Sequence, residues 1–215
     1  MAQRWGGWYV TGTHGTQLHM GNSMAEEKDK PETFHSEAGS NVTSLRGRFD
    51  TGAYLSPHSD IVALMVLEHQ TRMQNLITRV GFETRMALHD QVTMNKALGE
   101  PADYRSDTTK RRIRNAVEEL LKYMLFEEEV PLTHPIQGTS NFTREYQAGL
   151  LRELELKTRL YKYRCSPLIY SRSFDSLPEA ARQVLYPRLA ELLHDPARAG
   201  VGELVFKTKR EFRAV

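Results

Sequence analysis

The chain has 215 residues, of which 40% are hydrophobic and 26% are charged, and its formal net charge is +2. Such a chain is long enough for one sizeable hydrophobic core, and its near-neutral charge gives no reason to expect nucleic acid as a partner. The single cysteine, Cys165, excludes an internal disulfide. With no Cys-x-x-Cys pair, the sequence has no motif for zinc, an iron–sulfur cluster or a covalently attached c-type haem.

Residues 1–55 are predicted to form an irregular arm, because their many glycines favour turns over regular elements. Within the arm, residues 24–40 are polar and are predicted to form a solvated loop or a mobile linker. The aromatic side chains of Trp5 and Trp8 need burial, so the arm is expected to pack on a helical body. Residues 1–10 lack the apolar core of a signal peptide, and no signal peptide is predicted.

Residues 56–200 are predicted to form a helical bundle of four to five helices with one long central helix. That helix begins near Asp60, where either Ser59 or Asp60 can cap its first turn, and it ends before Gly99. A bend or break is expected near Gly81, because an unbroken helix of about 40 residues is long for a compact domain. Its apolar run at 61–67 is predicted to lie in the middle of the core. Seven residues are far fewer than the roughly 18 that span a bilayer, and no membrane span is predicted.

Further helices are predicted at 107–128, 142–163 and 178–194, from apolar residues at helical spacing. Pro187 is expected to kink the last of these. Residues 201–215 are predicted to be a C-terminal tail that forms a short helix or a frayed end. No stretch has a convincing strand pattern, so the predicted fold class is all-α.

Two histidines near the start of the long helix are candidate cofactor-binding residues. On a helical wheel, His69 lies in an apolar stripe with Val62 and Met73, a position typical of a hydrogen-bonded core histidine and also of a buried ligand. His58 joins this stripe if the helix extends to it. Eleven residues of straight helix separate the two by about 16 Å, which is too far for them to bind one ion.

Two more candidates, His14 and His19, lie in the glycine-rich arm beside Met20. Imidazole and thioether groups bind copper or haem iron, although polar loop residues commonly bond the backbone instead. The identity of any metal is not indicated. No Gly-x-Ser-x-Gly, P-loop or dinucleotide motif is present, and Cys165 is expected to be structural, so no independent catalytic activity is predicted.

Four segments of the sequence are distinctive: VTGTHG at 10–15, FDTGAYLSPHSDIVAL at 49–64, EHQ at 68–70 and CSPLIYS at 165–171. Together they resemble the C-terminal helical half of bacterial c-type cytochromes in which the haem-attachment cysteines lie upstream. This resemblance covers most of the chain, from about residue 9 to residue 194.

The resemblance implies a haem-associated helical module of a cytochrome-like electron-transfer protein, as a fragment of a longer chain. It implies a role near a haem for His14, His19, His58 or His69, an upstream cytochrome domain or a redox protein as partner, and a periplasmic or otherwise extracytoplasmic location. Because this chain lacks Cys-x-x-Cys-His, it would not attach the haem covalently. The alternative is a cofactor-free structural or protein-interaction module.

Overall fold

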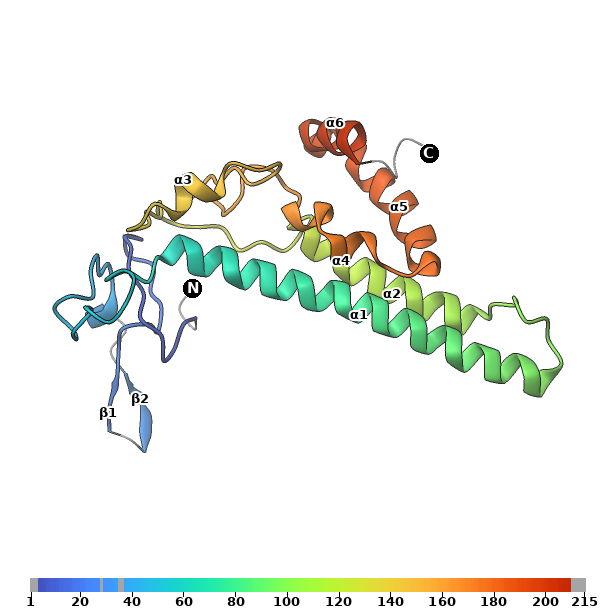
Figure 1. The fold of residues 1–215 in the computed structure, drawn as a ribbon, viewed down its shortest axis with the longest axis horizontal. Coiled ribbons are helices and arrows are strands. Elements are labelled where there is room, and N and C mark those ends of the chain that lie inside the picture. Colours follow the sequence, from blue (N-terminus) through green and yellow to red (C-terminus); the bar gives the residue numbers. More distant parts are fainter. Residues whose placement is uncertain (1–3, 28, 35–36, 210–215) are drawn as a thin grey trace. The chain divides into compact units, whose positions relative to one another are not determined.

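The computed structural model describes residues 4–27, 29–34 and 37–209, and this part of the chain is almost entirely helical outside its loops (Figure 1). The predicted all-α class with one long helix is confirmed. The α-helices are α1 (Ile61–Leu98), α2 (Asp107–Met124), α3 (Phe142–Tyr146), α4 (Arg172–Asp175), α5 (Glu179–Leu193) and α6 (Ala199–Thr208). Short 3-10 helices lie at η1 (Glu37–Gly39), η2 (Pro167–Tyr170) and η3 (Pro196–Arg198). No described helix is both long enough and apolar enough to cross a membrane.

The chain divides into two compact units. Unit 1 contains the residues up to 69 together with 130–162, and unit 2 contains 70–129 together with the residues from 163 onwards. The units group the residues differently from the predicted arm, bundle and tail, because the arm shares unit 1 with the first turns of α1 and with 130–162. Residues 210–215, the end of the predicted tail, lie outside the described residues.

A short hairpin replaces part of the polar loop predicted at 24–40. Strands β1 (Ala25–Glu27) and β2 (Lys30–Phe34) are antiparallel, with Ala25 opposite Phe34 and Glu27 opposite Lys30. The expectation of no strand was wrong here. All three residues of β1 are exposed, so this strand has no buried face and no apolar alternation that could predict it.

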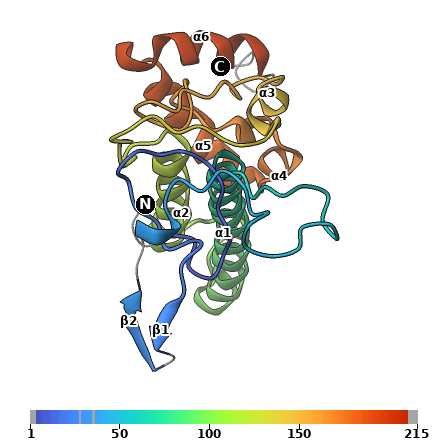
Figure 2. The same cartoon turned by 90° about the vertical axis from the view of Figure 1, so that its left-hand side faces the viewer.

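Helix α1 is continuous over 38 residues, so the predicted break near Gly81 is wrong. Glycine inside a helix costs about 1 kcal/mol relative to alanine. The burial of apolar residues on both sides of Gly81, namely Ile77, Val80 and Ala87, offsets this cost. Two partly exposed ion pairs also join α1 to α2 there: Arg79 pairs with Glu119 at 2.7 Å, and Glu83 pairs with Arg112 at 2.7 Å. In both ribbon views α1 and α2 lie side by side (Figures 1 and 2).

The apolar run at the start of α1 is buried on one side only. Ile61 and Val62 are fully buried, whereas Leu67 is 53% exposed. The helix therefore lies at the edge of the unit 1 core rather than in its middle, contrary to the prediction.

The helix predicted at 142–163 is wrong beyond Tyr146, where α3 ends. Leu151 and Leu156 have φ angles of 58° and 60°, a left-handed conformation that a right-handed helix does not contain. Leu154 instead forms an antiparallel bridge with Tyr161, and the Glu155 carboxylate accepts backbone N–H groups in the turn between them. Of the leucines that produced the helical pattern, Leu150 is 51% exposed, and the others, Leu151, Leu154, Leu156 and Leu160, are partly or fully buried in a loop.

The remaining predicted helices are present in unit 2 with shorter ends. Helix α2 stops at Met124, and the chain then turns at Phe126, whose φ is 55°. Helix α5 continues through Pro187, and α6 occupies most of the described part of the predicted tail. Helices α2 and α5 pack together, and Arg188 of α5 pairs with Glu118 of α2 at 3.1 Å.

Candidate functional site

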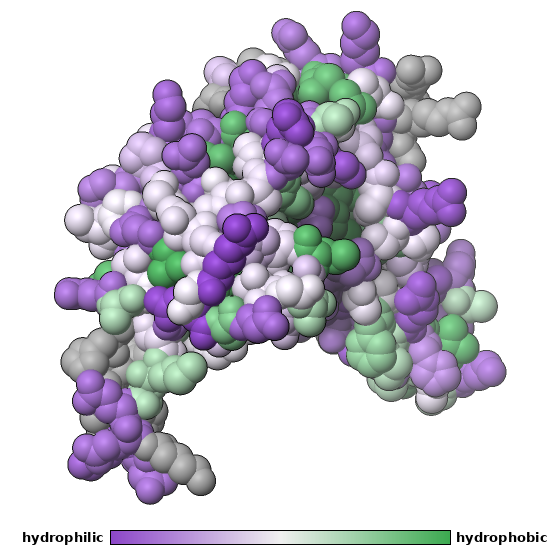
Figure 3. Space-filling view, turned by 60° about the vertical axis from the view of Figure 1, so that its left-hand side comes forward, coloured by the Kyte–Doolittle hydropathy of each residue, from purple (hydrophilic) through white to green (hydrophobic). Residues whose placement is uncertain are grey.

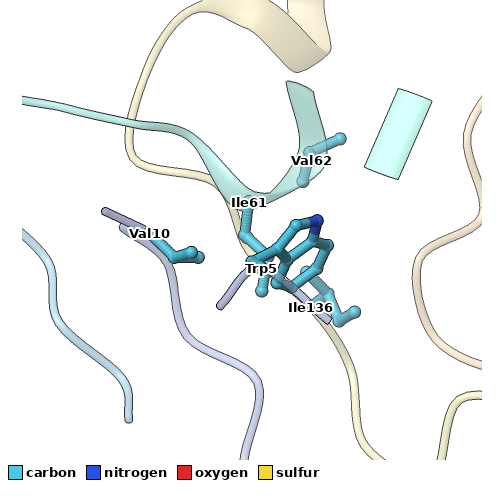
Figure 4. Close-up of a cluster of buried hydrophobic side chains, with 5 residues drawn as sticks. All are labelled: Trp5, Val10, Ile61, Val62 and Ile136. Carbon is cyan, nitrogen blue, oxygen red and sulfur yellow. The ribbon is translucent and has the colours of Figure 1, made fainter. Parts of the chain in front are cut away.

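The N-terminal arm, the first turn of α1 and the loop near residue 136 meet in one hydrophobic cluster of unit 1 (Figure 4). The indole of Trp5 lies among side chains that come from all three segments. Trp5 is buried, as its aromatic character predicted, whereas Trp8 is 60% exposed, so the same prediction was wrong for Trp8. The buried members of the cluster are Trp5, Val10, Ile61, Val62 and Ile136.

Backbone hydrogen bonds attach the arm to the residues immediately before α1. The Thr11 N–H donates to the carbonyl of Ser59 at 2.6 Å, and the Ile61 N–H donates to the carbonyl of Thr11 at 2.8 Å. The Thr13 N–H and the Gln137 N–H donate to each other's carbonyls at 2.9 Å. These backbone hydrogen bonds therefore fix the main chain next to His14 in the arm and next to His58 before α1.

Asp60 caps α1 as predicted, and it also joins two distant segments. Its Oδ1 accepts the Val62 N–H at 2.8 Å, which satisfies a free amide of the first turn. Its Oδ2 accepts the backbone N–H groups of Thr139 and Ser140 at 3.0 and 2.8 Å, and also the Ser140 hydroxyl at 2.6 Å. The carboxylate is buried, and its charge is stabilised entirely by hydrogen-bond donors rather than by a cation in these contacts.

His14 and His19 are brought together, and both are buried. Their ring centroids are 4.8 Å apart, and the His19 ring also lies edge-on to Trp5 at 5.6 Å. The Nε2 of His14 accepts the Asn41 N–H at 3.1 Å, and the Nδ1 of His19 accepts the Gly21 N–H at 3.0 Å. A neutral imidazole has one nitrogen lone pair, so in both rings that lone pair is already engaged by the backbone.

These hydrogen bonds assign the tautomers of the two rings. His14 carries its hydrogen on Nδ1, which is buried and has no hydrogen-bond partner among the described residues, and His19 carries its hydrogen on Nε2. Burial lowers the pKa of His14, and burial together with the neighbouring His14 lowers the pKa of His19 to about 4. Both rings are therefore neutral at pH 7.

His69 lies elsewhere in unit 1 and is 5% exposed. Its ring packs edge-on against Tyr161 at a centroid distance of 5.2 Å, and the Tyr161 hydroxyl lies 2.7 Å from that of Tyr146. Burial lowers the pKa of His69 to about 4. These features are those of a core histidine, one of the two roles that its place in the apolar stripe indicated.

His58 lies before α1 rather than in it, and its ring is only partly buried. Its neighbours are held on both sides, since Leu45 N–H donates to the Pro57 carbonyl at 3.0 Å and Ser59 N–H donates to the Thr11 hydroxyl at 3.0 Å. The Nδ1 of His58 is buried, and no group in the part of the chain that the structure describes forms a hydrogen bond with it. Of the four candidate histidines, His58 alone combines a fixed main chain with an uncommitted, partly accessible ring.

Neither a group of metal-binding side chains nor Cys165 provides a further candidate site in the described part of the chain. Within residues 4–27, 29–34 and 37–209, no three His, Cys, Asp or Glu side chains converge in a way that could hold a metal ion. Cys165 is fully buried, and burial raises the pKa of its thiol to about 12, which suppresses the reactive thiolate.

Sequence reasoning did not identify Asn41 and Tyr161, the residues that engage His14 and His69. Asn41 adopts a φ of 52°, which asparagine tolerates better than most residues, but no local pattern connects it to His14. The contact depends on two loops that are 27 residues apart in sequence.

Comparisons of the chain with protein-family models, curated proteins and solved structures find no match.

Proposed function

We propose that this chain is a haem-associated helical module of a cytochrome-like electron-transfer protein, acting beside a haem held by an upstream domain or a redox partner. An extracytoplasmic location is part of the same proposal. The supporting observation is the imidazole of His58, which is presented on a fixed main chain and forms no hydrogen bond within the described part of the chain. The resemblance of residues 49–64 to cytochrome sequences includes this histidine.

The four histidines fit a haem unequally. His14 and His19 would have to give up the N–H groups of Asn41 and Gly21 before either lone pair became available to iron. His69 is enclosed beside Tyr161. His58 needs no such rearrangement, so it is the residue that would contact the haem, whose chemistry is the gain and loss of one electron.

The test has two parts: the purified chain is titrated with haemin, and the chain is co-expressed with a cytochrome domain. In both, the absorbance of the Soret band is measured. We expect a shifted Soret band whose amplitude falls at least tenfold in His58→Ala. His89→Ala is the matched control, because His89 is an exposed histidine of unit 2, and it should leave the band unchanged. If no mixture gives a Soret change, or if His58→Ala and His89→Ala behave alike, the proposal is wrong.

The second candidate is a cofactor-free protein-interaction module, and a group of partly exposed aromatic side chains favours it. Phe49 lies between Tyr9 and Tyr54, at centroid distances of 4.9 and 5.6 Å. Tyr54 is 64% exposed, and its neighbour Leu55 is fully exposed. On the face drawn in Figure 3, hydrophobic residues form small groups among hydrophilic ones.

Elemental analysis of the chain purified from cells separates the two candidates. Stoichiometric iron or copper would remove the cofactor-free alternative. The interaction module instead predicts a metal-free chain in which Tyr54→Ser weakens partner binding without changing the helical circular dichroism.

A further inference from the structure

We infer that the contact between residues 14–22 and residues 37–41 is an acid-sensitive latch, which opens when His14 and His19 take up protons. This inference is independent of haem binding, because it concerns the two histidines whose lone pairs face the chain's own backbone.

The latch consists of a small set of hydrogen bonds around Asn41. Its N–H donates to the Nε2 of His14 at 3.1 Å, and its side-chain Oδ1 accepts the His14 N–H at 2.7 Å. Its Nδ2 donates to the Gly15 carbonyl at 2.9 Å. A second contact joins the same segments, since the Asn22 Nδ2 donates to the Gly39 carbonyl at 2.9 Å.

Protonation acts directly on one of these bonds, from Asn41 to His14, and on the bond from Gly21 to His19, which shapes residues 14–22 themselves. A proton from solvent can bind only to the lone pair of each ring, which is the Nε2 of His14 and the Nδ1 of His19. Those nitrogens currently accept the N–H groups of Asn41 and Gly21. Once protonated, each becomes a donor that faces another donor, so the hydrogen bond is lost and replaced by repulsion.

Among the described residues, no carboxylate contacts the ring of His14 or His19, and Glu37, the acidic residue of the partner segment, is exposed. The ring of His134 lies against Gly15, and Arg48 donates to the Asn22 and Ala38 carbonyls, so both of these neighbours are basic. Arg4, whose carbonyl accepts the Met20 N–H, directs its guanidinium to Glu68 and pairs with that carboxylate. Two imidazolium rings 4.8 Å apart would also repel each other.

The direction of the pH effect follows from linkage. Burial lowers the pKa of both histidines, and that of His19 to about 4, whereas an opened segment has the ordinary value of 6.5. The closed form therefore has its full stability above pH 6.5 and loses it as the pH falls towards 4. The equilibrium constant for closing the latch should fall by about tenfold per pH unit for each proton taken up.

Trp5 provides a local reporter, because its ring lies 5.6 Å from that of His19. The other tryptophan, Trp8, is 60% exposed and is removed by Trp8→Phe. In this full-length variant, we expect the emission of Trp5 to move to longer wavelength between pH 6.5 and 4, reversibly and before the helical circular dichroism changes. The complementary Trp5→Phe variant should show no such shift.

Two substitutions keep acceptors for the Asn41 and Gly21 N–H groups but remove the imidazoles that take up protons. Gln at position 14 can present an oxygen near the Nε2 position of the ring, and Asn at position 19 can present one near the Nδ1 position, so both can accept the same backbone N–H groups. The His14→Gln/His19→Asn protein, combined with Trp8→Phe, should show no emission shift above pH 4. His69→Gln should leave the shift of the single-tryptophan protein unchanged.

The inference is wrong if Trp5 emission is constant down to pH 4, if the doubly substituted protein keeps the same midpoint, or if His69→Gln abolishes the shift. If the double substitution prevents folding, amide hydrogen exchange of the wild-type chain tests the inference instead. The protection of the Asn41 and Gly21 amides should fall at least tenfold between pH 6.5 and 4.5, after correction for intrinsic exchange, while that of α2 amides is retained. Unchanged protection of both amides would overturn the inference.

Discussion

Replacing Asp60 with alanine is expected to lower the free energy of unfolding by about 2–4 kcal/mol, the sum of the cost of donors left without an acceptor and the loss of a helix cap. The carboxylate of Asp60 accepts donors from Val62 at the start of α1 and from Thr139 and Ser140 in a distant loop. Alanine leaves the buried Val62 N–H and the part-buried donors of Thr139 and Ser140 without this acceptor. It also removes the cap of α1, which alone contributes about 1 kcal/mol.

Urea denaturation, followed by circular dichroism and by tryptophan fluorescence, measures this effect. Asp50→Ala is the matched control, because Asp50 is an exposed carboxylate of the same unit that accepts one N–H, from Gly52. We expect that control to lose no more than about 1 kcal/mol. A loss below about 1 kcal/mol for Asp60→Ala would show that the buried donors find other partners.

Gln91→Leu is expected to destabilise the protein by about 3 kcal/mol through a different network, in unit 2. Gln91 is 5% exposed, and its Oε1 accepts the Ser106 hydroxyl and the Thr109 hydroxyl, both at 2.6 Å. Its Nε2 donates to the Oδ1 of Asn95 at 2.6 Å. Asn95 in turn donates to the carbonyls of Pro101 and Tyr104, so the network holds the turn between α1 and α2.

Leucine matches glutamine in size but satisfies none of these groups, so the cost is that of buried polar atoms without partners. Gln74→Leu makes the same change on the exposed side of α1, where Gln74 accepts one hydrogen bond from Ser173 at 2.8 Å, and it should cost less than about 1 kcal/mol. Because Gln91 and Asn95 share one network, the double substitution with Asn95→Leu should cost less than the sum of the two. Additive losses, or equal losses for Gln91→Leu and Gln74→Leu, would contradict this account.

The candidate histidines show how far local sequence information extends. Placing His69 on an apolar stripe of a helix needed only the helical period, and the ring is indeed buried. The pairing of His14 with His19 and the bond from Asn41 to His14 depend on how two loops meet, and the helical period contains no information about that. The role of His58 stays a prediction until the haem titration is done.

The sequence by itself determined where helices begin and end wherever the end is set by a residue at that position in the sequence. Asp60 caps the start of α1, and Gly99, with a φ of 69°, ends it. Tertiary structure alone decided that α1 continues through Gly81 and that the leucines after Tyr146 lie in a loop. The physical reason is that local preferences amount to tenths of a kcal/mol per residue, up to about 1 for glycine. Buried contacts between distant segments contribute more, and so they decide wherever the two conflict.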